Sequence, residues 1–237
     1  MRYALYITPP QHDALTIAAA RWLGRDAFLN GAVPHEDFDG FSPDEISALT
    51  AEPRRYGFHG TVKAPFELAP GRSETELLQA LEEFSAEVEP FVIPALVLGE
   101  IGPFFALVPE RRCEALHVFA DEAVRRFEPF RAPLGEADIA RRHPDRLTAS
   151  QRRNLATYGY PHVLGDFRYH MTLTGPVAPE RRATVRALLE DRFAAFIGAP
   201  LTVDTIGLFT EARRGAPFAV HSLPPLGTLT TPRMTAR

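Results

Sequence analysis

Cysteine and lysine are nearly absent from this sequence of 237 residues. The one cysteine, Cys113, excludes an internal disulfide and any metal site made of several cysteines. Lys63 is the one lysine among 26 basic residues, so arginine carries nearly all of the positive charge. No apolar run approaches the roughly 18 residues that cross a membrane, and the N-terminus predicts a strand rather than a signal peptide. We therefore expect a cytoplasmic protein without membrane contact.

An excess of basic residues is also missing. The formal net charge is −4, and the isoelectric point lies near 6.1. A protein that wraps a nucleic-acid backbone normally presents a basic surface or stripe. The composition therefore argues against a long nucleic acid as partner and is compatible with a small phosphorylated substrate.

A short pattern occurs twice in the chain. Residues 58–65 read Phe-His-Gly-Thr-Val-Lys-Ala-Pro, and residues 169–176 read Tyr-His-Met-Thr-Leu-Thr-Gly-Pro. In both copies an aromatic residue precedes a histidine, a threonine follows two positions later, and a proline lies six positions after the histidine. A single His-x-Thr sequence is common by chance. Two matched copies, each followed by a helix and then by strands, indicate one site built from two related halves.

Hydrophobic periodicity predicts an α+β fold in one bilobal domain. Capping boxes at Ser42, Ser73 and Thr148 predict the starts of three helices. The predicted strands are 2–8, 57–68, 91–98, 104–108, 167–174, 201–210 and 216–222, and further helices are predicted over 111–127 and 180–196. Strands 91–98 and 104–108 are expected to form a hairpin. The expected division is a first lobe over about 1–127 with an excursion over 24–57 that overhangs the site, a connecting segment over 128–166, a second lobe over 167–223 and a mobile tail over 224–237. Exchange of strands between the lobes is compatible with this division.

Alternate residues of a strand share one face, so each motif is expected to present its polar residues together. The apolar residues between them would then pack against helices. The polar residues are predicted to meet in a groove between the lobes. The two predicted sets are His59, Thr61 and Lys63 in the first copy and His170, Thr172 and Thr174 in the second.

Two imidazoles can supply one general base and one general acid near neutral pH. Hydrolysis of a phosphodiester needs both, because water must lose a proton and the departing alkoxide must gain one. The hydroxyls of Thr61 and Thr172 can donate to phosphoryl oxygens, and Lys63 can add positive charge. Neither motif has the spacing of a metal-ligand pair, so no metal or other cofactor is expected. His162 and His221 are interpreted as surface or core residues.

The paired motifs resemble those of the 2H phosphoesterase superfamily. Longer stretches resemble the DUF1045 family of proteins associated with phosphonate metabolism, and these are residues 56–66, 147–152, 158–161 and 167–175. The resemblance implies two lobes related by a pseudo-two-fold axis, each with an antiparallel sheet that faces a central groove and with helices outside. It also implies catalysis by His59 and His170 and phosphate binding by Thr61 and Thr172. The further candidates for substrate contact are Lys63, Thr174, Tyr6 and Arg168.

The function predicted from these features is metal-independent hydrolysis of a small cyclic phosphodiester by two-histidine acid–base catalysis. The substrate would be a sugar or nucleoside cyclic phosphate, and the phosphonate connection favours a phosphoribosyl cyclic phosphate. Two alternatives stay open. One is a binding module that holds a nucleotide or an RNA end without turning it over, and the other is an enzyme that processes RNA 2′,3′-cyclic phosphates or 2′-5′ linkages.

Overall fold

The computed structural model describes residues 1–227 and has helices arranged around antiparallel strands. The strands are β1 (Arg2–Ile7), β2 (Arg25–Asp26), β3 (Gly31–Ala32), β4 (Gly60–Phe66), β5 (Phe91–Ile93), β6 (Leu96–Ile101), β7 (Phe104–Pro109), β8 (Met171–Thr172), β9 (Leu201–Val203), β10 (Gly207–Glu211) and β11 (Phe218–Ser222). The helices are α1 (Ala14–Leu23), α2 (Pro43–Tyr56), α3 (Glu74–Glu87), α4 (Glu114–Arg126), α5 (Glu136–Ala140), α6 (Ala149–Tyr158) and α7 (Arg182–Arg192). The predicted α+β class is confirmed.

One seven-stranded sheet, in the order β11-β10-β1-β4-β8-β7-β6, runs through the molecule. All neighbouring strands in it are antiparallel. The late strands β10 and β11 extend the sheet beyond β1, and the earlier strands β6 and β7 extend it beyond β8. Both halves of the chain thus contribute to one continuous sheet in place of two separate ones. The division into two lobes stays a prediction.

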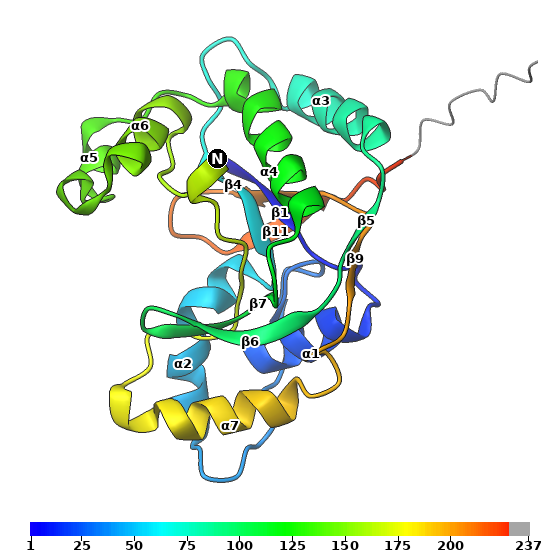
Figure 1. The fold of residues 1–237 in the computed structure, drawn as a ribbon, viewed down its shortest axis with the longest axis vertical. Coiled ribbons are helices and arrows are strands. Elements are labelled where there is room, and N and C mark those ends of the chain that lie inside the picture. The colour runs from blue at the N-terminus through cyan, green and yellow to red at the C-terminus, as the bar shows by residue number, and fades with distance from the viewer. Residues whose placement is uncertain (228–237) are drawn as a thin grey trace, which may run out of the picture.

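The helices cover the strands from two sides. Figure 1 shows α3 and α4 side by side above the central strands, with α1, α2 and α7 below them. Phenylalanines fill the space between α3 and α4: the ring of Phe84 lies 5.6 Å from that of Phe119 and 5.5 Å from that of Phe127, centroid to centroid. All three side chains are buried. Burial of such large apolar rings holds these helices on the sheet.

Local signals in the sequence set the helix starts. Capping boxes are present at Ser73 with Glu76 and at Thr148 with Gln151, and the Ser42 side chain caps α2 by accepting from the Glu45 amide. Gly159 ends α6 in the left-handed conformation, at φ 69°, which glycine adopts without the steric cost of a Cβ atom. The predicted hairpin is confirmed as β6–β7, in which Leu96 lies opposite Pro109 and Ile101 opposite Phe104; residues 91–93 of its predicted first strand instead form β5, which pairs with β9.

Several predicted segments differ from the structure. The strand predicted over 167–174 is reduced to the two residues of β8, and the strand predicted over 201–210 is divided into β9 and β10. The excursion over 24–57 contains the helix predicted to start at Ser42, α2, whose Ile46 and Thr50 are buried, and the carbonyl of Leu49 accepts a 2.6 Å hydrogen bond from the Gly175 amide. Of the predicted tail, residues 224–227 are attached to the body, since the Leu226 amide donates to the Asp204 carbonyl at 2.8 Å. Residues 228–237 lie outside the described part. Within residues 1–227, no helix is long and apolar enough to cross a bilayer.

The glycine of the first motif lies at the centre of the sheet. Gly60 pairs with Met171, which is the contact that joins β4 to β8. A Cβ atom added at Gly60 would lie 2.2 Å from Cε2 of Tyr169, far inside van der Waals contact. The Tyr169 ring is buried and has no space to retreat into without disturbing its neighbours. Only glycine lets the strands approach this closely.

We expect Gly60→Ala to lower the free energy of unfolding by about 1–3 kcal/mol, the usual cost of overpacking a core. Adding Tyr169→Leu should recover part of that loss, because it removes the ring atoms in the clash. Thermal or denaturant unfolding of the three proteins measures both effects. Gly135→Ala is the matched control, since a Cβ there meets nothing within 4 Å. Equal stability of Gly60→Ala and wild type would contradict the close approach.

Candidate active site

The two motifs lie side by side where β4 meets β8. Gly60 and Met171 pair in antiparallel register. Each histidine directly precedes its strand, and continuing the same register by one residue would set it across from the threonine of the other motif, His59 toward Thr172 and His170 toward Thr61. Of these four residues, Thr61 and His170 line a common pocket.

Backbone carbonyls fix the tautomer of both histidines. Nδ1 of His59 lies 2.9 Å from the Gly57 carbonyl oxygen, and Nδ1 of His170 lies 2.7 Å from the Arg168 carbonyl oxygen. Because a carbonyl only accepts, Nδ1 carries the proton in each ring. In the neutral rings Nε2 is then the basic atom. For His59 this atom is 3.2 Å from Oγ1 of Thr61, whose hydroxyl can donate to it.

Burial keeps both histidines neutral. The ring of His59 stacks on that of Tyr6 at 3.7 Å between centroids and 23° between planes. Burial lowers the pKa of His59 to about 4; the bond to the Gly57 carbonyl opposes this shift, and the charge of His170 adds to it. Burial also lowers the pKa of His170, against the bond to the Arg168 carbonyl. Each Nε2 is therefore unprotonated at neutral pH in the free protein.

Both motifs contribute to one pocket of about 190 Å³, which we call the motif pocket. Its lining also includes residues from the connecting segment, to which the sequence assigned no role. The full lining is Thr61, Ile101, Gln151, Tyr160, His162, Phe167, Arg168 and His170.

Some residues that line the motif pocket were not predicted from the sequence. Gln151 and Tyr160 fall within the stretches that resemble the family, and that resemblance was the one signal that could have found them. His162 is exposed, in agreement with its interpretation as a surface residue, and it also lines the pocket, with its ring 5.6 Å from that of Tyr160. His221 is remote and pairs with Glu74 at 3.2 Å.

Lys63 lies outside the motif pocket, contrary to its predicted role. Tyr6 pairs with Thr61 and Leu5 pairs with Lys63, so one step along β1 spans two residues of β4. This β-bulge reverses the alternation of faces between Thr61 and Lys63. Lys63 is 3% exposed, and its Nζ donates to Glu128 at 2.8 Å and to the Val124 carbonyl at 3.2 Å. The lysine is a buried structural residue.

Thr174 and Tyr6 are likewise not open to a ligand. Strand β8 ends at Thr172, and Thr174 is 1% exposed, with its Oγ1 accepting from the Phe105 amide at 3.0 Å. Tyr6 is 1% exposed beneath the ring of His59, so it supports the histidine and does not reach the substrate. Among the other candidates, Arg168 is exposed and lines the pocket, and Thr172 is half-buried.

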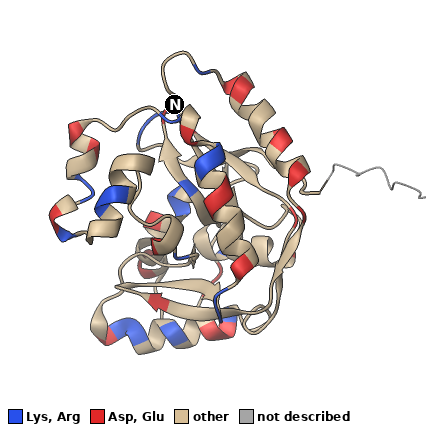
Figure 2. Cartoon of the chain, turned by 45° about the horizontal axis from the view of Figure 1, so that its top comes forward, with Lys and Arg blue, Asp and Glu red and all other residues tan. Residues whose placement is uncertain are grey.

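Charged residues of both signs are spread over the helices. Figure 2 shows basic and acidic positions interspersed, with acidic positions recurring along α3. Within the part of the chain that is described, no group of three or more His, Cys, Asp or Glu side chains is placed to hold a metal ion.

Comparison with known proteins confirms the family resemblance. Residues 61–219 match the family model described as "Protein of unknown function (DUF1045)". Two curated relatives are named ribose 1,5-bisphosphate phosphokinase PhnN. The protein from Janthinobacterium sp. (strain Marseille) is 36% identical over 221 residues, which are 92% of this chain and 49% of the relative. The protein from Laribacter hongkongensis (strain HLHK9) is 31% identical over 226 residues, 94% of this chain and 51% of the relative. This chain thus spans about half the length of these relatives.

Solved structures with a similar fold are distant in sequence. The protein TT0787 of Thermus thermophilus has a TM-score of 0.48 at 15% identity, over 96% of this chain and 98% of that one. Escherichia coli LigT, solved in complex with NADP+, has a TM-score of 0.43 at 14% identity, over 95% and 96% of the two chains. A structure described as a phosphoesterase has a TM-score of 0.44 at 14% identity, over 95% and 97%.

We expect an NMR titration of the imidazole nitrogens to show His59 neutral down to about pH 4. In His170→Gln the pKa of His59 should rise, because a neighbouring positive charge is removed. His12→Gln serves as control, since His12 is exposed and should leave the titration of His59 unchanged. A His59 that titrates near the ordinary value of about 6.5 would contradict its buried environment.

We expect Glu128→Ala to lower the free energy of unfolding by about 3 kcal/mol, since it leaves Lys63 buried without a counter-charge. Lys63→Met should cost less, because Glu128 keeps Arg131 as a partner at 2.7 Å. Chemical denaturation measures both changes. If Lys63→Met folds normally but loses more than ten-fold in catalytic rate, the structural role of Lys63 is contradicted and a role in catalysis is supported.

Proposed function

Because the chain belongs to the DUF1045 family, we propose that it hydrolyses a small cyclic phosphodiester with the histidines of its two His-x-Thr motifs. The observation that supports the proposal is the pairing of Gly60 with Met171, which brings the two motifs together, with Thr61 and His170 lining one pocket. Each histidine also has its Nδ1 bonded to a carbonyl, so each offers Nε2 for proton transfer. Proton transfer at two positions is what this reaction needs.

The reaction proceeds by attack of water on phosphorus. Because both histidines are neutral in the free protein, one of them takes up a proton from solvent at Nε2 as the anionic phosphodiester binds beside it and raises its pKa. Nε2 of the other histidine accepts the proton of the water, and a new phosphorus–oxygen bond forms. The bond from phosphorus to one ring oxygen breaks, and the protonated histidine gives its Nε2 proton to that oxygen, which leaves as a hydroxyl; the proton taken from the water then returns to solvent. The hydroxyls of Thr61 and Thr172 donate to the phosphoryl oxygens as charge builds on them. No step calls for a metal or another cofactor.

The names of the curated relatives suggest the substrate. They are called ribose 1,5-bisphosphate phosphokinases, and this chain corresponds to about half of each. A domain joined to an enzyme that uses ribose 1,5-bisphosphate is well placed to produce that compound. Opening a 5-phosphoribosyl 1,2-cyclic phosphate at the 2-oxygen yields it directly. We therefore infer this cyclic phosphate as the substrate, in line with the predicted connection to phosphonate metabolism.

The two-lobed arrangement belongs to the same proposal. The β4–β8 junction divides the sheet into β11, β10, β1 and β4 on one side and β8, β7 and β6 on the other. A pseudo-two-fold axis through this junction would relate the two motifs, so that each lobe brings one histidine and one threonine. In this arrangement the early strands β6 and β7 pair beside β8 in one lobe, and the late strands β10 and β11 pair beside β1 in the other. This exchange of strands would connect the two lobes.

We expect His59→Ala and His170→Ala each to lower kcat/KM by about 100-fold or more, because each removes one proton transfer. Phosphorus NMR of the cyclic phosphate, with EDTA present, measures turnover in wild type and variants. His12→Ala is the matched control at an exposed position. Undiminished turnover in either motif variant would rule out the two-histidine mechanism. Binding of the cyclic phosphate without any product would identify a binding module, and turnover restricted to RNA ends would identify an RNA-processing enzyme.

A further inference from the structure

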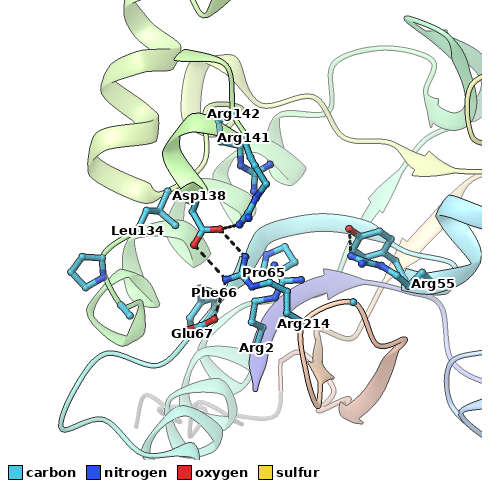
Figure 3. A pocket seen from close by; sticks show the side chains of 14 residues that line it. Arg2, Arg55, Pro65, Phe66, Glu67, Leu134, Asp138, Arg141, Arg142 and Arg214 are labelled. Carbon is cyan, nitrogen blue, oxygen red and sulfur yellow. Dashed lines mark hydrogen bonds and ion pairs between the residues drawn. The ribbon is translucent and has the colours of Figure 1, made fainter. Parts of the chain in front are cut away.

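A second and larger pocket lies beside the motif pocket and is lined by five arginines. Its volume is about 510 Å³, against about 190 Å³ for the motif pocket. The arginines come from separate parts of the chain, which the fold brings together (Figure 3). They are Arg2 of β1, Arg55 of α2, Arg141 and Arg142 after α5, and Arg214 between β10 and β11. We call this cavity the arginine pocket.

Carboxylates neutralise three of these arginines. Arg214 contacts Glu67 at 3.0 Å and Asp138 at 2.7 Å, and Asp138 also pairs with Arg141. Figure 3 shows Glu67, Asp138, Arg141 and Arg214 grouped together, with Arg55 apart from them. Arg2 bonds to Glu211, which is fully buried behind the pocket wall. These ion pairs hold the wall together and have little capacity left for a ligand.

Arg142 is different. Within residues 1–227 its side chain has neither an ion pair nor a hydrogen bond, and its guanidinium lies 5.0 Å from the centre of the Tyr160 ring. The side chain is half-buried, so the charge is only partly hydrated. Such a guanidinium keeps its planar fork of donors available for an anion, and it suits phosphate oxygens in particular.

Arg55 is only weakly compensated. Its nearest carboxylate oxygen, on Glu211, is 3.9 Å away and belongs to a residue that Arg2 already engages. One Nη of Arg55 donates to the Tyr56 hydroxyl at 2.6 Å, which holds the guanidinium over the Tyr56 ring. Arg55 and Arg142 thus supply positive charge to the pocket that the protein's own carboxylates do not cancel.

Two tyrosines connect this pocket to the catalytic histidines. Tyr56 lines the arginine pocket, and its ring lies 6.0 Å from that of His59. Tyr160 lines the motif pocket, and Arg142 of the arginine pocket lies against its ring. The two pockets are therefore neighbours, with Tyr56 and Tyr160 between the histidines and the arginines.

We propose that the arginine pocket binds a second phosphate group of the substrate, a phosphate monoester, through Arg142 with support from Arg55. This inference rests on the proposed function, because it takes the cyclic phosphate to lie at the two histidines. The pocket then selects cyclic phosphodiesters that carry a separate phosphate over those that do not. A sugar with a terminal phosphate has the required size and charge.

The test compares two substrates in two arginine variants. Ribose 1,2-cyclic phosphate with a 5-phosphate carries the second group, and the same molecule without the 5-phosphate lacks it. We expect Arg142→Gln to lower kcat/KM by about 10- to 100-fold for the first substrate, the usual loss of a charge-assisted hydrogen bond, and by less than about two-fold for the second. Arg55→Gln should act in the same direction with a smaller effect. Arg142→Lys should restore part of the loss, because it keeps the charge.

Arg125→Gln, on the outer side of α4, is the matched control and should change neither substrate. Equal losses for both substrates in Arg142→Gln, or no loss for either, would overturn the proposal. If wild type turns over neither substrate, the proposed function fails. Calorimetric titration with ribose 5-phosphate then still tests whether the arginine pocket binds a phosphate monoester. Binding that weakens at least ten-fold in Arg142→Gln would then support it. Equal binding, or none, would overturn it.

Discussion

The backbone pairing of Gly60 with Met171 is the contact on which the site depends. It joins β4 to β8, and it lies between the two His-x-Thr motifs. Its register, continued by one residue, would set each histidine across from the other motif's threonine, so the two halves of the site are assembled by hydrogen bonds between strands that are distant in the sequence. The close approach requires glycine, because a Cβ at position 60 would overlap the ring of Tyr169.

Desolvation then sets the chemistry of the histidines. Tyr6 lies under His59, and the carbonyls of Gly57 and Arg168 hold the two Nδ1 protons. Both rings are neutral in the free protein, because burial disfavours the imidazolium. The strands of the site itself bring no free positive charge, since Lys63 is paired with Glu128. Positive charge comes instead from Arg168 at the rim of the motif pocket and from arginines on α2 and on the connecting segment in the arginine pocket.

Local sequence signals were sufficient for several elements. The capping boxes of α3 and α6 and the hairpin of β6 and β7 are confirmed, since each depends on residues a few positions apart. Elements that depend on distant partners were predicted less well. Strand β8 is shorter than predicted, because its ladder is limited by β4 and β7. Residues 224–227 were expected to be mobile and are held by Asp204 and Ser85.

The sequence by itself determined which chemistry the chain carries: two histidines and two threonines in matched motifs, and the family to which they belong. Tertiary structure decided which side chains reach the site. The β-bulge after Thr61 turns Lys63 into the core, and the fold brings Tyr160 and His162 from the connecting segment to the pocket. The physical reason is that the hydrogen-bond register with the neighbouring strand decides which face of the sheet a side chain points to. A one-residue shift in that register moves the side chain to the opposite face, and no local sequence pattern records such a shift.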